Sequence, residues 1–336
     1  NKKVCGWLEL DDLEKEKLFS FNDSYLEFLN NVKTEREANK YIIRELTNNG
    51  FVNVNNLDKL NVGDKVYYDN RGKSVFAAVV GSEKVENGLN IVGAHIDSPR
   101  LDLKPNPVYE DSKLALFKTH YYGGIKKYQW TTIPLAIHGV IVKTTGEKVY
   151  INIGEDDNDP IFTITDLLPH LAQKQYEKKL SEAVEGESLN LLVGSIPNDE
   201  KEDPIKKNIL KLLNEKYGIN EIDFYSSEIE IVPAFKARSL GFDNSMVASY
   251  GQDDRVCAYG TLKAIVDCIT TEYTNVAIFA DKEEIGSVGN TGMYSEMFDN
   301  FIHMLLEKTG STSPSSLNKT YCNSRMLSAD VGAGVD

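Results

Sequence analysis

One histidine and one carboxylate in the first third of the chain have the spacing of a metal-binding pair. His95 and Asp97 lie in the stretch Gly-Ala-His-Ile-Asp-Ser-Pro-Arg. Residues two apart in a strand face the same side of a sheet, so the Asp97 carboxylate can orient the His95 imidazole toward a metal ion. A His-x-Asp pattern taken alone is more often structural, so this interpretation depends on the rest of the chain.

Three further stretches carry carboxylates near the ends of predicted elements. Asp253 and Asp254 stand just before a predicted helix, where they could equally cap its free amide hydrogens. Glu283 and Glu284 follow a predicted buried strand, at the kind of strand end where open α/β sheets place their sites; a solvated loop is the alternative. Asp330 follows a short apolar segment, where a capping or turn role is the alternative.

Together these residues are the kind of set that a pair of divalent cations needs. Imidazole and carboxylate ligands suit zinc, and carboxylate-rich sites also accept manganese or cobalt. Two cations about 3.5 to 4 Å apart can share a bridging carboxylate and a bridging hydroxide, and a carboxylate outside the ligand set can act as general base. Glu283 and Glu284 could supply one of each, because neighbours in an extended segment point in different directions.

The elements that must position these residues follow from the periodicity of apolar residues. Residues 8–18 and 24–47 have helical spacing, and a strand at 89–94 delivers His95 at its end. After Gly241 helices and strands alternate, which predicts an α/β fold with a mixed, mostly parallel sheet and helices on both faces. The later predicted elements are helices at 257–269 and 295–308 and strands at 276–280 and around 326–327.

Residues 105–238 have a different sequence pattern, which predicts many short β-rich segments and one or two helices. We therefore predict an inserted β-rich domain over 105–238. It would divide the main domain into residues 1–104 and 239–336.

The charge and composition of the 336 residues limit the partners. Acidic side chains outnumber basic ones by 51 to 37, a net charge of −14, which disfavours nucleic acid and anionic lipid surfaces. The longest apolar stretches are about half of the roughly 20 residues that a membrane helix needs, and no apolar signal segment opens the chain. Four cysteines without C-x-x-C spacing favour a reducing compartment. We expect a cytoplasmic protein without nucleic-acid or membrane partners.

The chemical motifs resemble those of the aspartyl aminopeptidase family of dinuclear zinc exopeptidases. The motifs that carry the resemblance are residues 95–104, 251–259, 281–289 and 328–330. The resemblance also extends into the predicted insert, at residues 121–130 and 154–160. It implies a zinc exopeptidase-like fold for the main domain and two divalent ions, most simply zinc.

The same resemblance implies a role for each candidate residue. Glu283 would be the general base acting on a metal-bridging hydroxide, and Asp97 the partner of His95. The implied metal ligands are His95, Asp253, Glu284 and Asp330, with Asp253 bridging the two ions.

The family's last metal ligand is a histidine far downstream of the Ser-Ala-Asp motif, whereas this chain ends six residues after Asp330. We therefore expect a fragment that lacks this ligand and part of the substrate pocket. His303 precedes Asp330 and lies on a helical pattern, so we expect a structural role for it.

The implied activity is hydrolysis of the N-terminal residue of peptides. The family's name, together with Arg100, Lys104 and Arg255 beside the motifs, predicts a preference for N-terminal Asp or Glu. A tetrahedral deblocking-type aminopeptidase of different specificity is the first alternative. A non-catalytic assembly protein that has lost its metal is the second, and Glu283 argues against it.

The resemblance also implies a homo-oligomer, built from dimers into a dodecamer through the inserted domain. A histidine of that domain would then reach the active site of the neighbouring subunit. His170 fits this role best among the histidines of the insert, although an ordinary partly buried histidine is the alternative.

Overall fold

The computed structural model describes residues 5–269, 271–311, 313–332 and 334. The chain divides into two compact units. The first comprises residues 1–97, 236–283 and 287–336, and the second comprises 98–235 and 284–286. That the second unit serves oligomerisation stays a prediction.

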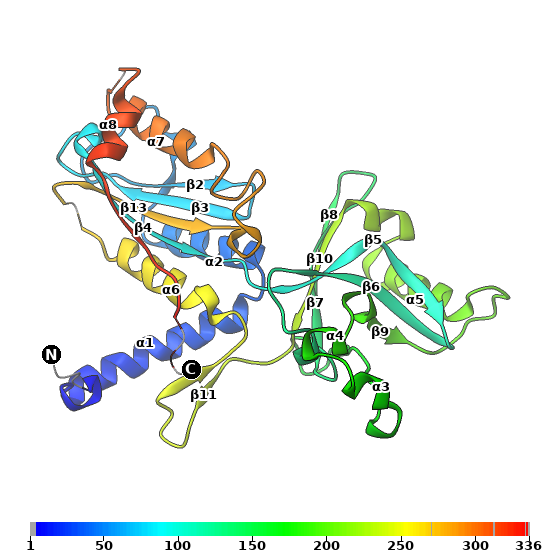
Figure 1. The fold of residues 1–336 in the computed structure, drawn as a ribbon. Helices are drawn as coiled ribbons and strands as arrows, with labels where there is room; N and C mark the ends of the chain where they lie inside the picture. Colours follow the sequence, from blue (N-terminus) through cyan, green and yellow to red (C-terminus); the bar gives the residue numbers. More distant parts are fainter. Residues whose placement is uncertain (1–4, 270, 312, 333, 335–336) are drawn as a thin grey trace. The chain divides into compact units, whose positions relative to one another are not determined.

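A six-stranded sheet forms the centre of the first unit, in the order β1-β2-β3-β13-β4-β14 (Figure 1). Its strands are β1 (Val52–Asn53), β2 (Lys65–Asn70), β3 (Ser74–Val79), β4 (Leu89–His95), β13 (Thr274–Ala280) and β14 (Arg325–Ser328). β4 pairs in parallel with β13 and β14, and β1 pairs in parallel with β2. The two pairings of β3 are antiparallel. This mixed, mostly parallel sheet confirms the predicted fold class.

Helices cover both faces of this sheet (Figure 1). They are α1 (Asp12–Asn31), α2 (Glu35–Asn48), α6 (Gln252–Val266), α7 (Met297–Lys308) and α8 (Ser316–Asn323). Val75 and Ala77 of β3 pack in a core with residues of α1, α2 and α6. Phe76 and Ala78 pack in a second core with residues of α7. Because successive strand residues point to opposite faces, the apolar run in β3 requires a helical layer on each side.

The helix boundaries near the N-terminus differ from the predicted ones at 8–18 and 24–47. α1 continues to Asn31, and α2 begins at Glu35 with Thr34 as its N-cap. The Glu37 backbone N–H donates to the Thr34 hydroxyl at 3.3 Å, and the Glu37 carboxylate accepts from the Thr34 N–H at 3.1 Å. This reciprocal capping box begins α2 inside an apolar pattern that is continuous in sequence, so the predicted boundaries were wrong.

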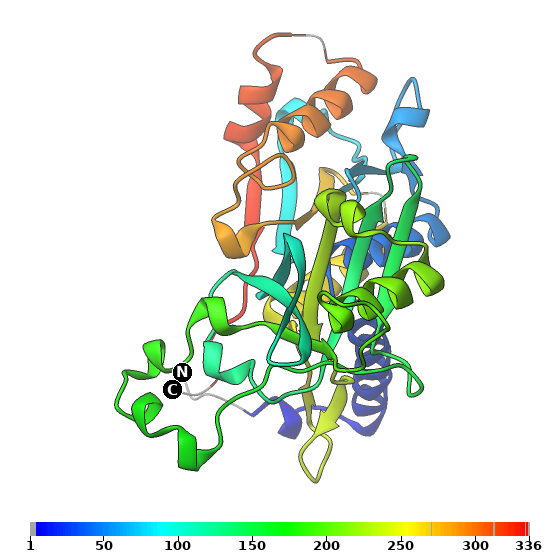
Figure 2. The same ribbon diagram turned by 90° about the vertical axis from the view of Figure 1, so that its right-hand side faces the viewer.

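The second unit is built on an antiparallel sheet in the order β8-β7-β10-β5-β6-β9, seen from a second side in Figure 2. Its strands are β5 (Arg100–Asp111), β6 (Leu114–Tyr122), β7 (Leu135–Val142), β8 (Lys148–Ile153), β9 (Leu191–Gly194) and β10 (Ser227–Pro233). Its helices are α3 (Gln173–Tyr176), α4 (Leu180–Ala183) and α5 (Pro204–Tyr217). α5 begins where the Glu110 carboxylate accepts from the N–H groups of Ile205 and Lys206, and it packs against β5, β6 and β9.

A hairpin of β11 (Arg238–Leu240) and β12 (Met246–Ala248) precedes α6 in the first unit. Among the helices of the described residues, none is both long enough and apolar enough to span a bilayer.

Candidate metal centre

The carboxyl ends of three parallel strands of the first unit meet at one edge of its sheet. Ala280 at the end of β13 is in register with His95 at the end of β4, and Ser328 of β14 is in register with Gly93. The Ala329 N–H still donates to the Gly93 carbonyl at 2.8 Å. Open α/β sheets bind ligands at such an edge, and the segments that follow these strands carry the candidate carboxylates.

His95 is the centre of this group and is only 4% exposed. Its Nε2 atom lies 3.1 Å from Asp253 Oδ1, and its Nδ1 atom lies 3.0 Å from the backbone oxygen of Asp97 and 3.4 Å from Asp97 Oδ1. Asp97 is fully buried and lies after the end of β4, and its contacts with Nδ1 leave Nε2 turned toward Asp253.

The charges around His95 favour its protonated form when no metal is present. Burial on its own lowers the pKa of His95, but the hydrogen bond to Asp97 and the charges of Asp97, Asp254 and Glu283 raise that pKa to about 9. The carboxylates around His95 therefore favour a positive charge at the imidazole.

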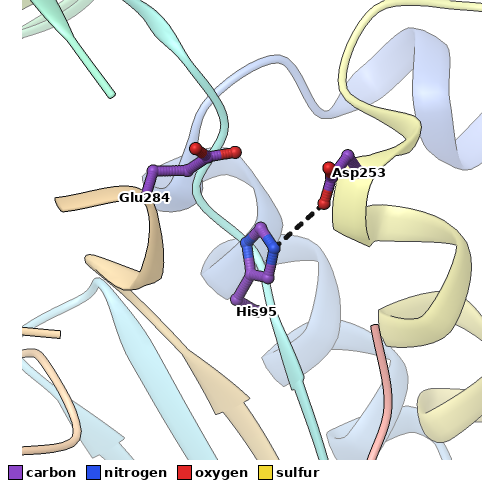
Figure 3. Close-up of side chains that lie close together, drawn as sticks. All are labelled: His95, Asp253 and Glu284. Carbon is purple, nitrogen blue, oxygen red and sulfur yellow. Dashed lines mark hydrogen bonds and ion pairs between the residues drawn. The ribbon is translucent and has the colours of Figure 1, made fainter. Parts of the chain in front are cut away.

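Two groups of side chains have potential ligand atoms within 4.8 Å of one another. One consists of His95, Asp253 and Glu284, and the other of His95, Asp254 and Asp330. Figure 3 shows the carboxylates of Asp253 and Glu284 on either side of the imidazole, with Asp253 at the start of α6 and Glu284 on the loop after β13. One imidazole nitrogen with carboxylate oxygens is a donor set that fits zinc.

The start of α6 explains why two adjacent carboxylates reach the imidazole. Asp253 and Asp254 have non-helical backbone angles, so the first turn of α6 is kinked. Asp254 is fully buried, and its Oδ2 atom accepts from the His95 backbone N–H at 3.4 Å. Burial raises the pKa of Asp254, and hydrogen bonds from Cys257 and His95 oppose that rise. Asp254 therefore lies in the second possible ligand group, with His95 and Asp330, although the sequence singled out Asp253 and not Asp254.

Glu283 and Asp330 lie at the rim of the same group. Glu283 Oε2 is 3.8 Å and Asp330 Oδ1 is 3.9 Å from His95 Nε2, and both side chains are about half exposed. The Glu283 backbone N–H donates to Asp97 Oδ1 at 3.2 Å. Glu283 belongs to neither ligand group of the described residues, although its carboxylate lies near His95.

His170 belongs to the second unit, whereas His95 belongs to the first. It is exposed in a single 3-10 turn, Pro169–Leu171, of the second unit. His303 is exposed on α7 and joins neither ligand group of the described part of the chain. The role of His170 stays a prediction.

A histidine and several carboxylates at the carboxyl edge of an α/β sheet form a donor set that fits a divalent metal ion. Residues 28–336 match the family described as "Aminopeptidase I zinc metalloprotease (M18)". The chain belongs to this M18 family, and it is a zinc aminopeptidase by that membership.

Relatives and solved structures agree with this assignment. The chain is 50% identical over 337 residues to a probable M18 family aminopeptidase 1 of Clostridium acetobutylicum, covering 98% of this chain and 72% of the relative. The crystal structure of an M18 aminopeptidase from Thermotoga maritima is similar with a TM-score of 0.96 and 45% identity, over 100% of this chain and 74% of that one. A dodecamer of the yeast aminopeptidase mApe1 shares the fold, with a TM-score of 0.72 and 18% identity, over 94% of this chain and 72% of that one.

Proposed function

We propose that the protein removes the N-terminal residue of peptides at a site made by His95, Asp253 and Glu284, with Glu283 as general base. The observation that carries the proposal is the different placement of two adjacent glutamates. Glu284 is in a ligand group with His95 and Asp253, whereas Glu283 approaches His95 to 3.8 Å and is in neither group. A ligand and a base are the two roles that a metal-dependent hydrolase requires side by side.

Zinc bound by these residues supplies Lewis acidity toward the scissile carbonyl and a lowered pKa for the attacking water. The residues of the chain do the rest. Asp97 keeps the His95 imidazole in the orientation that leaves Nε2 for the ion. The Glu283 carboxylate accepts the proton of the attacking water and returns it to the leaving amine.

The native centre is proposed to hold two ions, with Asp253 bridging, Asp330 as a further ligand, and zinc preferred over manganese or cobalt. Both ligand groups contain His95, and the Nε2 atom of His95 can bind only one ion. A second ion therefore needs a ligand from outside the two groups in place of His95. Elemental analysis of the full-length protein tests this: about two zinc ions per subunit support it, and one or none contradicts it.

The adjacent glutamates provide a matched test of the two roles. Glu283→Gln is expected to retain zinc and to lose roughly 10²- to 10⁴-fold in kcat, which is the usual contribution of a general base. Glu284→Gln is expected to lose zinc, because it removes a charged ligand. Wild-type turnover in Glu283→Gln would show that Glu283 is not the base.

A preference for N-terminal Asp or Glu remains part of the proposal, supported by the family resemblance. The basic residues beside the motifs do not strengthen it. Arg255 is fully buried and donates to the Lys33 carbonyl, and Arg100 is buried beside Asp102 and Glu230. Comparing chromogenic Asp, Glu, Leu and Lys substrates decides the matter: a higher kcat/KM for Leu or Lys would exclude the acidic preference.

We propose that the enzyme works in the cytoplasm as a homo-oligomer in which His170 completes the site of a neighbouring subunit. Support comes from the segment around His170, where large apolar side chains are exposed. Leu168 is 66% and Leu171 69% exposed, and clusters of this kind mark protein interfaces. The solved structure of yeast mApe1, which shares the fold, is a dodecamer.

Mixing two inactive variants tests this shared site. His170→Ala is expected to lose roughly 10²-fold or more in kcat at unchanged zinc content, the cost of removing one donor to a developing oxyanion. Co-assembly of His170→Ala with Glu283→Gln should restore part of the activity, because some interfaces then combine both intact residues. Mixed oligomers without recovery would place His170 in its own subunit's site or in none.

A further inference from the structure

We propose that Asp281 and Thr291 are positioning residues that fix the loop carrying Glu283. The inference rests on the proposed role of Glu283 as the base. It concerns residues 281–291, which follow β13, and it assigns a function to two buried polar side chains that hold no metal in the proposed mechanism.

The first observation is the way in which Asp281 closes this loop. Asp281 is the first residue after β13 and is 1% exposed. Its Oδ1 atom accepts from the Lys282 backbone N–H at 2.8 Å, and its Oδ2 atom accepts from the Thr291 hydroxyl at 2.5 Å. Thr291 is also buried. One carboxylate therefore joins the two ends, ten positions apart, of the segment in which Glu283 lies.

The second observation is the backbone of that segment. Lys282 and Ser287 have φ angles of 67° and 58°, in the left-handed region that non-glycine residues seldom occupy. The Ser287 N–H donates to the Lys282 carbonyl at 2.6 Å. Conformations of this kind persist only where the surroundings hold them, and the buried Asp281–Thr291 hydrogen bond is such a constraint.

The third observation links the loop to the imidazole. The Glu283 N–H donates to Asp97 Oδ1 at 3.2 Å, and Asp97 in turn holds His95. Two contacts thus set the position of the Glu283 peptide. Asp281 accepts from the N–H of the preceding residue, Lys282, and Asp97 accepts from the N–H of Glu283 itself. This fixes where the Glu283 carboxylate can be relative to His95.

The surroundings of Asp281 indicate that its carboxylate is costly to bury. Burial and the nearby charge of Glu35 raise the pKa of Asp281 to about 6, opposed by the hydrogen bond from Thr291 and the charge of Lys73. Lys73 Nζ lies 2.9 Å from Glu35 Oε1 in the same interior. A neutral side chain would avoid this cost, so the carboxylate is best explained by the geometry that it imposes on the loop.

Thr291→Val removes the hydroxyl at nearly constant volume, and Thr291→Ser retains it as the matched control. In the zinc-loaded enzyme, Thr291→Val is expected to lower kcat about 10- to 100-fold, the cost of a displacement on the order of 1 Å. KM stays unchanged, because substrate binding does not use the hydroxyl, and kcat is compared per bound zinc, because the ligand Glu284 lies in the same loop. The acid limb of the pH profile of kcat/KM shifts, since it reports the base. Thr291→Ser should restore both properties.

A double-mutant cycle with Glu283→Gln separates this inference from the proposed function. If Thr291 acts through Glu283, Thr291→Val has little further effect in the Glu283→Gln background. Additive losses, or a Thr291→Val enzyme with wild-type kcat and pH profile, would overturn the positioning role while leaving Glu283 as the base. Wild-type turnover in Glu283→Gln would instead overturn the proposed function itself.

Asp281→Asn covers the case in which Thr291→Val does not fold, because Asn has nearly the same volume and retains one acceptor. The same fall in kcat per bound zinc at constant KM is expected. A folded Asp281→Asn enzyme with wild-type kcat would contradict the inference.

Discussion

Zinc binding to the metal-free protein is expected to release about one proton from His95 at pH 7. Asp97 and the neighbouring carboxylates raise the pKa of His95 to about 9, so at pH 7 the protonated form outweighs the neutral one by roughly 100 to 1. A metal ion binds only the neutral imidazole. Competition with this proton therefore weakens zinc binding by about 10²-fold at pH 7 relative to a neutral site, and by about tenfold for each further unit of acidification.

Isothermal titration calorimetry in buffers of different ionisation enthalpy measures the protons released. Asp97→Asn is the matched control, because it removes the charge that raises the pKa of His95. Proton release at pH 7 should fall in that variant. No release from the wild-type protein, or the same release from Asp97→Asn, would refute the reasoning about His95.

Three further predictions concern stability and reactivity. His95 has a raised pKa, so its contribution to the stability of the metal-free protein is full below about pH 6.5 and is lost as the pH rises to about 9; His95→Gln should flatten this dependence in urea titrations. Burial and Asp254 raise the pKa of the Cys257 thiol to about 12, so at pH 8 mass spectrometry should find it alkylated far more slowly than the exposed Cys322. Lys73→Met leaves the buried Glu35 carboxylate without the lysine at 2.9 Å, which should cost about 3–5 kcal/mol of unfolding free energy by urea titration; a cost below about 1 kcal/mol, as for a surface pair, would contradict it.

The helices and strands of the first unit were predictable where the apolar periodicity of the sequence matches the face that is buried in the fold. The strands at 276–280 and 89–94 and the helix at 295–308 are found as β13, β4 and α7 with shifts of a few residues. The break before α2 was not predicted, because the apolar periodicity runs through it and only the reciprocal hydrogen bonds of Thr34 and Glu37 reveal it. α8 was missed because its eight residues are mostly polar.

The site could be predicted as a set of residues but not as a geometry. Strand ends gather His95 and the carboxylates after β13 and β14, and that follows from the parallel alternation. The position of the Asp254 side chain near His95 depends on the irregular first turn of α6, and no periodicity in the sequence predicts that turn. Asp281 and Thr291 are ten residues apart in a loop, so their contact is visible only in three dimensions. The burial of Arg100 and Arg255 likewise could not be predicted, since proximity to a motif in sequence says nothing about burial.

Anomalous diffraction at the zinc edge from crystals of the full-length enzyme locates the zinc relative to these residues. We expect an anomalous peak about 2.0–2.2 Å from His95 Nε2 and from a carboxylate oxygen of both Asp253 and Glu284, with a second zinc peak that shares Asp253. The Glu283 carboxylate should lie beside that peak without coordinating it. An active enzyme whose zinc peak lies away from His95, or whose zinc is bound by Glu283 in place of Glu284, would contradict the account.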